Sequence, residues 1–169
     1  MAPFLRKKIV MGNDLPCLYF RKLRMLYCSE LQLISFYSEV AAHAADHSVE
    51  AMTDECRERR NLLETLALNH GISVAGDDCQ SMRRLISASR LTLKDDFSSG
   101  DVAQDICESV HRLQILNYSV ARSLAAKAGF KEDTAALDAM LDRLVDRFPA
   151  ACETIVPLGM VEGPDLVAR

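Results

Sequence analysis

Four side chains could together hold a metal ion if the fold brings them to one place. Glu30, Glu55 and Glu58 supply carboxylates, and His111 supplies an imidazole. Carboxylate and imidazole groups are the ligands that iron and manganese take between facing helices. One interpretation of the sequence is therefore an iron or manganese centre with these four ligands. A centre of this kind would consume oxygen or peroxide.

A permanent cation offers these carboxylates a different partner. Arg59 follows Glu55 by four residues, which is about one helical turn, so the two side chains can pair directly. Glu30 lies within a stripe of apolar residues, and a carboxylate buried there needs a cation, a hydrogen-bond donor or a metal. We expect Arg59 to form a core ion pair with Glu30 and Glu55 in place of a metal, and therefore no cofactor.

The six cysteines stand singly along the chain, at positions 17, 28, 56, 79, 107 and 152, without a C-x-x-C pair. This spacing fits neither a zinc site nor a dense disulfide scaffold. We expect reduced thiols. A redox sensor built on Cys28, Cys56 or Cys107 is a further hypothesis, although all three lie near apolar stripes, where a thiolate is disfavoured.

Helices must position these side chains, because apolar residues recur every three or four positions over four long segments. The pattern predicts helices over residues 18–45, 48–69, 101–128 and 134–155. A short extra helix is predicted over residues 79–93, in the long connection between the second and third helices. Pro149 is expected to kink or end the fourth helix.

Apolar residues also predict which faces of the last two helices point inward. On the third helix these residues are Val102, Ile106, Val110, Leu113, Leu116, Val120 and Leu124, and His111 and Gln114 fall on the flank of the stripe. On the fourth helix they are Leu137, Met140, Leu141, Leu144, Val145 and Phe148. The fourth helix is therefore expected to offer no metal ligand.

Two short links and one long connection between long helices are typical of a four-helix bundle with a ferritin-like crossover. The sequence predicts an all-α fold of this ferritin-like kind over residues 18–156. Residues 1–17 are expected to form an N-terminal extension, and residues 157–169 a C-terminal tail.

The composition is that of an ordinary soluble domain. Apolar residues make up 49% and charged residues 26% of the chain, and no apolar run approaches the about 20 residues of a membrane span. The net charge of −4 argues against nucleic-acid binding. No signal peptide is apparent, so we expect a cytoplasmic protein without a membrane partner.

Three short motifs together carry a resemblance to a known family. The run Leu-Tyr-Cys-Ser-Glu-Leu-Gln-Leu over residues 26–33 is similar to the Leu-Tyr-x-Ala-Glu-Lys-Gln-Leu of the YciE/YciF-like family of bacterial ferritin-like proteins. Cys79 and Met82, followed by Leu85 and Ile86, match its Cys-x-x-Met-x-x-Leu-Ile element. Tyr118 and the Ala-Gly-Phe of residues 128–130 are similar to the end of its third helix. The resemblance spans about residues 18–156 and implies a ferritin-like dimer in a stress-associated setting.

The resemblance also implies a metal site, which this chain keeps only in part. The family pattern has a glutamate on helix one, His-x-x-Glu on helix two, Glu-x-x-Glu on helix three and two adjacent glutamates on helix four. Glu30 matches the first position, and Glu55 and Glu58 keep the second spacing. The later positions fall on His111 and Gln114, and on Arg143 and Leu144. We therefore expect a non-catalytic bundle, with a divergent metal-binding oxidase as the alternative.

Overall fold

The structure is a computed structural model that describes residues 14–44, 47–95 and 100–147. Every regular element in these ranges is an α-helix: α1 (Leu15–Ala44), α2 (His47–Asn69), α3 (Gln80–Asp95), α4 (Gly100–Ala128) and α5 (Lys131–Arg147). The predicted all-α class and the short extra helix are thus confirmed within the described ranges. Of the helices described, none combines the length and the apolar character that crossing a membrane requires.

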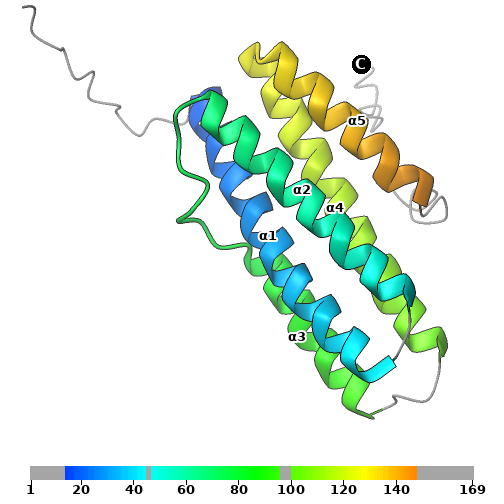
Figure 1. Cartoon of the computed structure of the whole chain (residues 1–169). Helices are drawn as coiled ribbons and strands as arrows, with labels where there is room; N and C mark the ends of the chain where they lie inside the picture. Colours follow the sequence, from blue (N-terminus) through cyan, green and yellow to red (C-terminus); the bar gives the residue numbers. More distant parts are fainter. Residues whose placement is uncertain (1–13, 45–46, 96–99, 148–169) are drawn as a thin grey trace, which may run out of the picture.

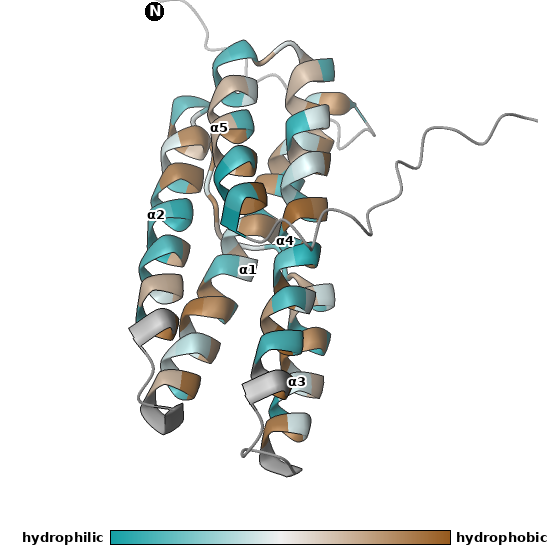
Figure 2. Cartoon of the chain, turned by 90° about the vertical axis from the view of Figure 1, so that its right-hand side faces the viewer, coloured by the Kyte–Doolittle hydropathy of each residue, from teal (hydrophilic) through white to brown (hydrophobic). Residues whose placement is uncertain are grey.

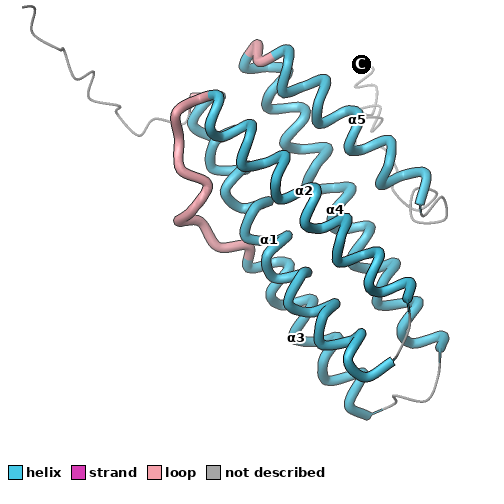
Figure 3. Tube along the Cα trace, in the orientation of Figure 1, coloured by secondary structure: helices cyan, strands magenta, loops and turns pink. Residues whose placement is uncertain are grey.

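The helices α1, α2, α4 and α5 run side by side (Figure 1). α1 and α2 run in opposite directions, as do α4 and α5, whereas α2 and α4 run in the same direction. α1 packs against α2, and α4 packs against α5 and against α1. α3 contacts both α1 and α4. Figure 3 shows the loop from α2 to α3 descending along the outside of α1 before α3 begins. α3 therefore covers one half of the α1–α4 pair, and α5 lies beside the other half of α4 (Figure 1).

Local hydrogen bonds decide where the helices begin. The backbone N–H of Cys17 donates to Asp14 Oδ1 across 2.9 Å, so Asp14 caps α1. The helix consequently begins at Leu15, three residues before the expected boundary at 18. Thr134 donates its hydroxyl to the carbonyl of Phe130 across 2.7 Å, so it lies inside the first turns of α5. α5 therefore begins at Lys131 and not at Thr134.

Glycines end α2 and α4, as the sequence predicts. Gly71 and Gly129 adopt φ angles of +64° and +81°, the left-handed conformation that favours glycine after a helix. The N–H of Ile72 donates to the carbonyl of Ala67, and that of Phe130 donates to Ala125. These bonds satisfy carbonyl groups that the last helical turn leaves open.

The hydrophobic core consists of two clusters. One contains Tyr19, Leu23, Leu26, Leu63, Leu66, Ile115, Tyr118, Ala121, Ala125, Leu137, Met140 and Leu144. The other contains Leu33, Phe36, Tyr37, Val49, Met52, Cys56, Cys79, Met82, Ile86, Leu93 and Val110. Polar residues lie between them: Glu30 on α1, Arg59 on α2 and Gln114 on α4. Figure 2 shows the accompanying alternation of apolar and polar positions along the helices.

The inward face of α4 differs from the predicted one. Leu116 and Val120 are 47% and 41% exposed, whereas His111, Gln114 and Tyr118 are buried. The prediction followed the most apolar stripe, but the true interior face carries hydrogen-bonding side chains and small alanines. On α5, Val145 was likewise predicted inward and is exposed. Phe148, Pro149, Ile155 and the tail over 157–169 lie outside the described residues.

Candidate functional site

The Glu30 carboxylate lies at the centre of the polar layer and accepts hydrogen bonds from two neighbouring helices. Arg59 Nε donates to Glu30 Oε2 across 3.1 Å from α2. Gln114 Nε2 and the Tyr118 hydroxyl donate to Oε1 across 3.2 and 3.1 Å from α4. Glu30 is fully buried, so these donors replace the hydration that its charge loses.

The Arg59 guanidinium lies beside Glu30 and is buried as well. Its Nη2 lies 2.9 Å from the Cys56 sulfur, and its Nη1 lies 3.8 Å from Glu55 Oε2. Burial lowers the pKa of Arg59, but the charge of Glu30, the nearby Cys56 and Tyr118 and the hydrogen bond to Glu30 together raise that pKa above its ordinary value. Arg59 therefore remains a cation in the core.

The remaining titratable groups of the layer are held in their neutral forms. Burial, together with the charge of Glu30, raises the pKa of the Tyr118 hydroxyl far above its ordinary value. Burial also raises the pKa of the Cys56 thiol, and Glu30 adds to the effect. Burial and the nearby Arg59 charge lower the pKa of His111 to about 4. Glu30 and Arg59 thus supply opposite charges among neutral neighbours.

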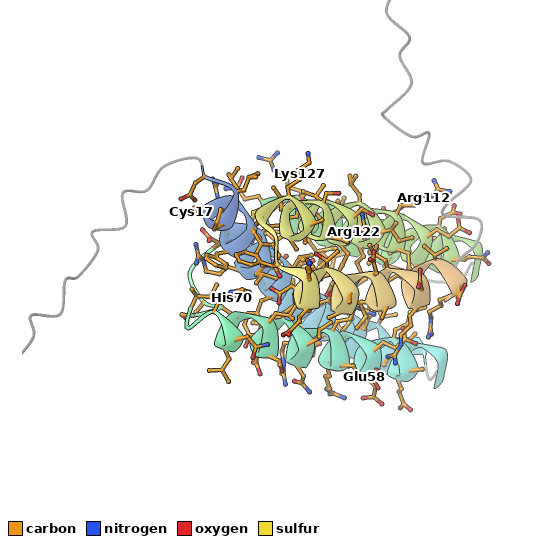
Figure 4. All side chains as sticks on the ribbon, turned by 90° about the horizontal axis from the view of Figure 1, so that it is seen from above. Cys17, Glu58, His70, Arg112, Arg122 and Lys127 are labelled. Atoms are coloured by element: carbon orange, nitrogen blue, oxygen red, sulfur yellow. The ribbon has the colours of Figure 1, made fainter. Side chains whose placement is uncertain are left out.

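The predicted metal ligands do not meet. The Glu58 side chain is 65% exposed and pairs with Arg143 across 3.5 Å. Figure 4 shows it on the outer side of α2, away from the bundle interior. Glu55 lies at the edge, 34% exposed, where it pairs with Arg147 and reaches Arg59. His111 is buried in the interior with Gln114, one turn along α4.

On α2, Cys56 and Arg59 stand three residues apart and are both buried in the polar layer. The glutamates chosen from the sequence, Glu55 and Glu58, precede these two by one residue each. The signal was present in the sequence, because Cys56 belongs to the apolar stripe of α2 and Arg59 lies on the same side three residues later. From the sequence, Arg59 is expected in the core beside Glu30, and its Nε lies 3.1 Å from Glu30 Oε2.

These residues do not fit a dinuclear metal centre. The Glu30 oxygens already accept three donors, and a permanent cation occupies the adjacent space. No group of three or more histidine, cysteine or acidic side chains converges on one point anywhere in the described ranges. A metal bound to Glu30 would have to displace the buried Arg59 guanidinium. Within the polar layer, Arg59 has no second carboxylate partner that is as deeply buried as Glu30.

A groove opens beside this layer, between α2 and α5. It encloses about 410 Å³ and is lined by Glu55, Glu58, Arg59, Met140, Arg143, Leu144, Asp146 and Arg147. Two ion pairs cross it, Glu58 with Arg143 and Glu55 with Arg147. We call this groove the seam pocket. The sequence patterns did not predict this pocket, because apolar periodicity indicates which face of a helix points inward but not how far apart two neighbouring helices lie.

A second polar group ties three helix ends together. The buried carboxylate of Asp133 accepts a 2.6 Å hydrogen bond from the Tyr19 hydroxyl. The same oxygen lies 2.7 Å from His70 Nε2. The rings of Phe20 and Phe130 pack on His70, with centroids 5.0 and 4.4 Å from it. The sequence marked His70 only as a helix stop, and nothing in its spacing indicated this contact.

Comparison with known proteins places the chain in one family. The model of the family described as "Domain of unknown function (DUF892)" matches residues 14–145. No curated protein and no solved structure matches the chain. The matched range includes Glu30, Arg59 and Gln114 as well as most of the seam pocket. Because the match covers well over half of the residues, the chain belongs to the DUF892 family.

Proposed function

We propose that this chain is a ferritin-like bundle without a resident metal, and that it acts as a homodimeric binding or structural protein, not as an enzyme. The observation that carries the proposal is the buried hydrogen bond from Arg59 to Glu30. A stress-associated setting is proposed from the family resemblance of the sequence motifs, and a cytoplasmic location is proposed because no signal peptide is apparent.

Electrostatics supports the metal-free interpretation. Two unit charges about 4 Å apart interact by about 4 kcal/mol at an effective dielectric constant of about 20, and a divalent ion doubles this value. A metal bound to Glu30 would therefore be repelled strongly by the neighbouring Arg59 guanidinium, which cannot lose its proton at physiological pH. The metal would also have to compete with the donors Gln114 and Tyr118.

The alternative is a divergent iron or manganese enzyme that consumes oxygen or peroxide, with Glu30, Glu55, Glu58 and His111 as ligands. One observation favours it: His111 is buried and its pKa is lowered to about 4, so its imidazole is neutral, as a metal ligand must be. The exposed position of Glu58 and its ion pair with Arg143 count against it.

Elemental analysis separates the two proposals. The purified full chain is loaded with Fe(II) or Mn(II) and desalted, and the bound metal is counted per chain. We expect far less than one equivalent in the unaltered protein. About two equivalents per chain, lost in Glu30→Gln but retained in Asp142→Asn on the exposed side of α5, would overturn the proposal.

Activity and assembly provide the remaining tests. Iron-dependent consumption of oxygen or peroxide is expected to be absent, and to be equally absent in Glu30→Gln. A rate that the unaltered chain shows and this variant lacks would favour the enzyme. Sedimentation equilibrium measures the proposed dimer directly, and a monomer at all concentrations would remove that part of the proposal.

A further inference from the structure

We propose that the seam pocket binds a small organic carboxylate, whose charged group is held by Arg59 and Arg147 and whose apolar body rests on Met140 and Leu144. The inference deepens the proposed binding role and rests on it, because it needs Arg59 to remain in the core without a metal. The ligand class follows from the lining of the pocket, its volume and the position of its charges.

The seam is open because side chains rather than backbones span it. α2 and α5 approach each other far less closely than α1 and α2 or α4 and α5. The contacts described across the seam join polar or charged groups: Glu58 to Arg143, Glu55 to Arg147 and His70 to Asp133. Such pairs exchange readily with solvent where they are exposed. A ligand can therefore enter at the mouth of the pocket by displacing exposed ion pairs.

The inner wall of the pocket is apolar apart from one cation. Met140 and Leu144 are 9% and 2% exposed and lie on the same face of α5. Arg59 lines the same pocket from α2. A volume of about 410 Å³ lies within the range of about 300–1,000 Å³ that small-molecule sites occupy. The space therefore suits a molecule with a short apolar chain and one anionic end.

The Arg59 guanidinium keeps one nitrogen for such a ligand. Its Nε and Nη2 are engaged with Glu30 and Cys56. Its Nη1 lies 3.8 Å from Glu55, which is beyond hydrogen-bond distance. Glu55 also pairs with Arg147, so one carboxylate at the edge of the pocket bridges two guanidinium groups. A ligand carboxylate could take this bridging position while Glu55 turns outward to water.

The depth of the charges favours an anion over a cation. Arg59, Arg143 and Arg147 balance Glu55, Glu58 and Asp146 in number. Glu58 and Asp146 are exposed at the rim, where water screens them, whereas Arg59 is buried at the inner wall. Glu30 balances the charge of Arg59, so the preference for an anion comes from Arg59 Nη1 and Arg147, which both lose their carboxylate partner when Glu55 moves aside. Glu55 therefore acts as an internal competitor of the ligand.

Titration calorimetry of the full, metal-free chain tests the proposal, with hexanoate, acetate, inorganic phosphate and hexylamine as probes. We expect saturable binding of hexanoate, weaker binding of acetate and phosphate, and none of hexylamine. Because Arg147→Gln removes a charge-assisted hydrogen bond to the ligand, it should weaken hexanoate binding about tenfold or more. Glu55→Gln should tighten it several-fold, since the competing charge is lost.

The matched control is Arg90→Gln, which removes an exposed arginine paired with Glu39 on the α1–α3 side and should leave hexanoate affinity unchanged. Three outcomes would overturn the proposal: no saturable hexanoate binding, weaker binding in Glu55→Gln, or phosphate or hexylamine binding more tightly than hexanoate. Failure of the proposed function is distinguishable, because it appears as metal uptake in the loading experiment whatever the titration shows.

Discussion

Arg59 on α2 donates its Nε–H to the buried carboxylate of Glu30 on α1 across 3.1 Å. The pair lies between the two apolar clusters of the core and links α1 to α2 by a polar contact. Removing one member of a buried ion pair leaves an uncompensated charge, whereas removing both charges together can be nearly neutral. The pair therefore couples the two residues energetically.

Arg59→Met should lower the free energy of unfolding by about 3–5 kcal/mol, because the buried Glu30 carboxyl group would lose its cation. The double variant Glu30→Gln/Arg59→Met should regain a large part of this loss, since glutamine keeps an oxygen for Tyr118 and Gln114. Urea unfolding of both variants measures the coupling. The control is Arg57→Met, which breaks an exposed pair with Asp54 and should cost less than about 1 kcal/mol. Additive losses in the double variant would show that the ion pair is not coupled.

The stability of the fold should fall as the pH drops from about 6.5 toward 4, in part because of His111. Burial and the charge of Arg59 lower its folded pKa to about 4 from an ordinary value of 6.5. Between these values the unfolded chain binds more protons than the folded one, so stability is complete above the unfolded pKa and declines in acid. The difference between the folded and unfolded pKa of His111 corresponds to about 3 kcal/mol of stability, all of which is lost once the pH lies below the folded pKa.

Urea unfolding of the unaltered chain and of His111→Gln, at several pH values between 7 and 4, checks this expectation. The stability difference between the two proteins should shrink or reverse as the pH falls, because glutamine takes up no proton. The comparison cancels contributions from the other acidic groups. A difference that stays constant over this range would mean that His111 does not titrate in the folded protein as expected.

The helices could be predicted from the sequence because their signals are local. Asn69, His70 and Gly71 marked the end of α2, and the structure ends that helix at Asn69. The start of α1 was missed by three residues because the prediction relied on apolar periodicity and overlooked Asp14 as a cap. Periodicity locates a helix better than it locates the helix ends.

The polar layer was harder to predict, because hydrogen bonds to one another, and not apolar character, account for the burial of its side chains. Leu116 is more apolar than Gln114, yet Gln114 is buried because Glu30 on another helix accepts its amide hydrogen. Arg59 is buried for the same reason. Arg59 was expected in the core as the cation that a buried Glu30 needs, whereas the partnership of Gln114 joins residues distant in sequence, and spacing on one helix does not reveal it. Glu30 was found because its position in an apolar stripe required a partner.

The Cys56 thiol should be unreactive in the folded protein. It is fully buried, and burial followed by the charge of Glu30 raises its pKa, so the nucleophilic thiolate is scarce. In a variant that keeps only Cys56, labelling by a thiol reagent at pH 8 should proceed no faster than unfolding, and urea should accelerate it. A variant that keeps only the partly exposed Cys17 is the control and should be labelled much faster. Equal rates would restore the hypothesis of a Cys56 redox sensor.

Substitution of Asp133 should destabilise the fold strongly. Its buried carboxylate, in the first turn of α5, contacts Tyr19 on α1 and His70 at the end of α2. Asp133→Ala leaves the fully buried Tyr19 hydroxyl without its acceptor and removes the contact with His70. An unsatisfied buried hydroxyl and a lost charged hydrogen bond together should lower the free energy of unfolding by about 2–4 kcal/mol.

The matched control is Asp138→Ala on the same helix. It removes an ion pair with Arg122 that is nearly half exposed, and this loss should cost less than about 1 kcal/mol. Urea unfolding of the two variants decides the matter: equal losses would mean that the buried contacts of Asp133 hold these helix ends together no better than a solvated ion pair.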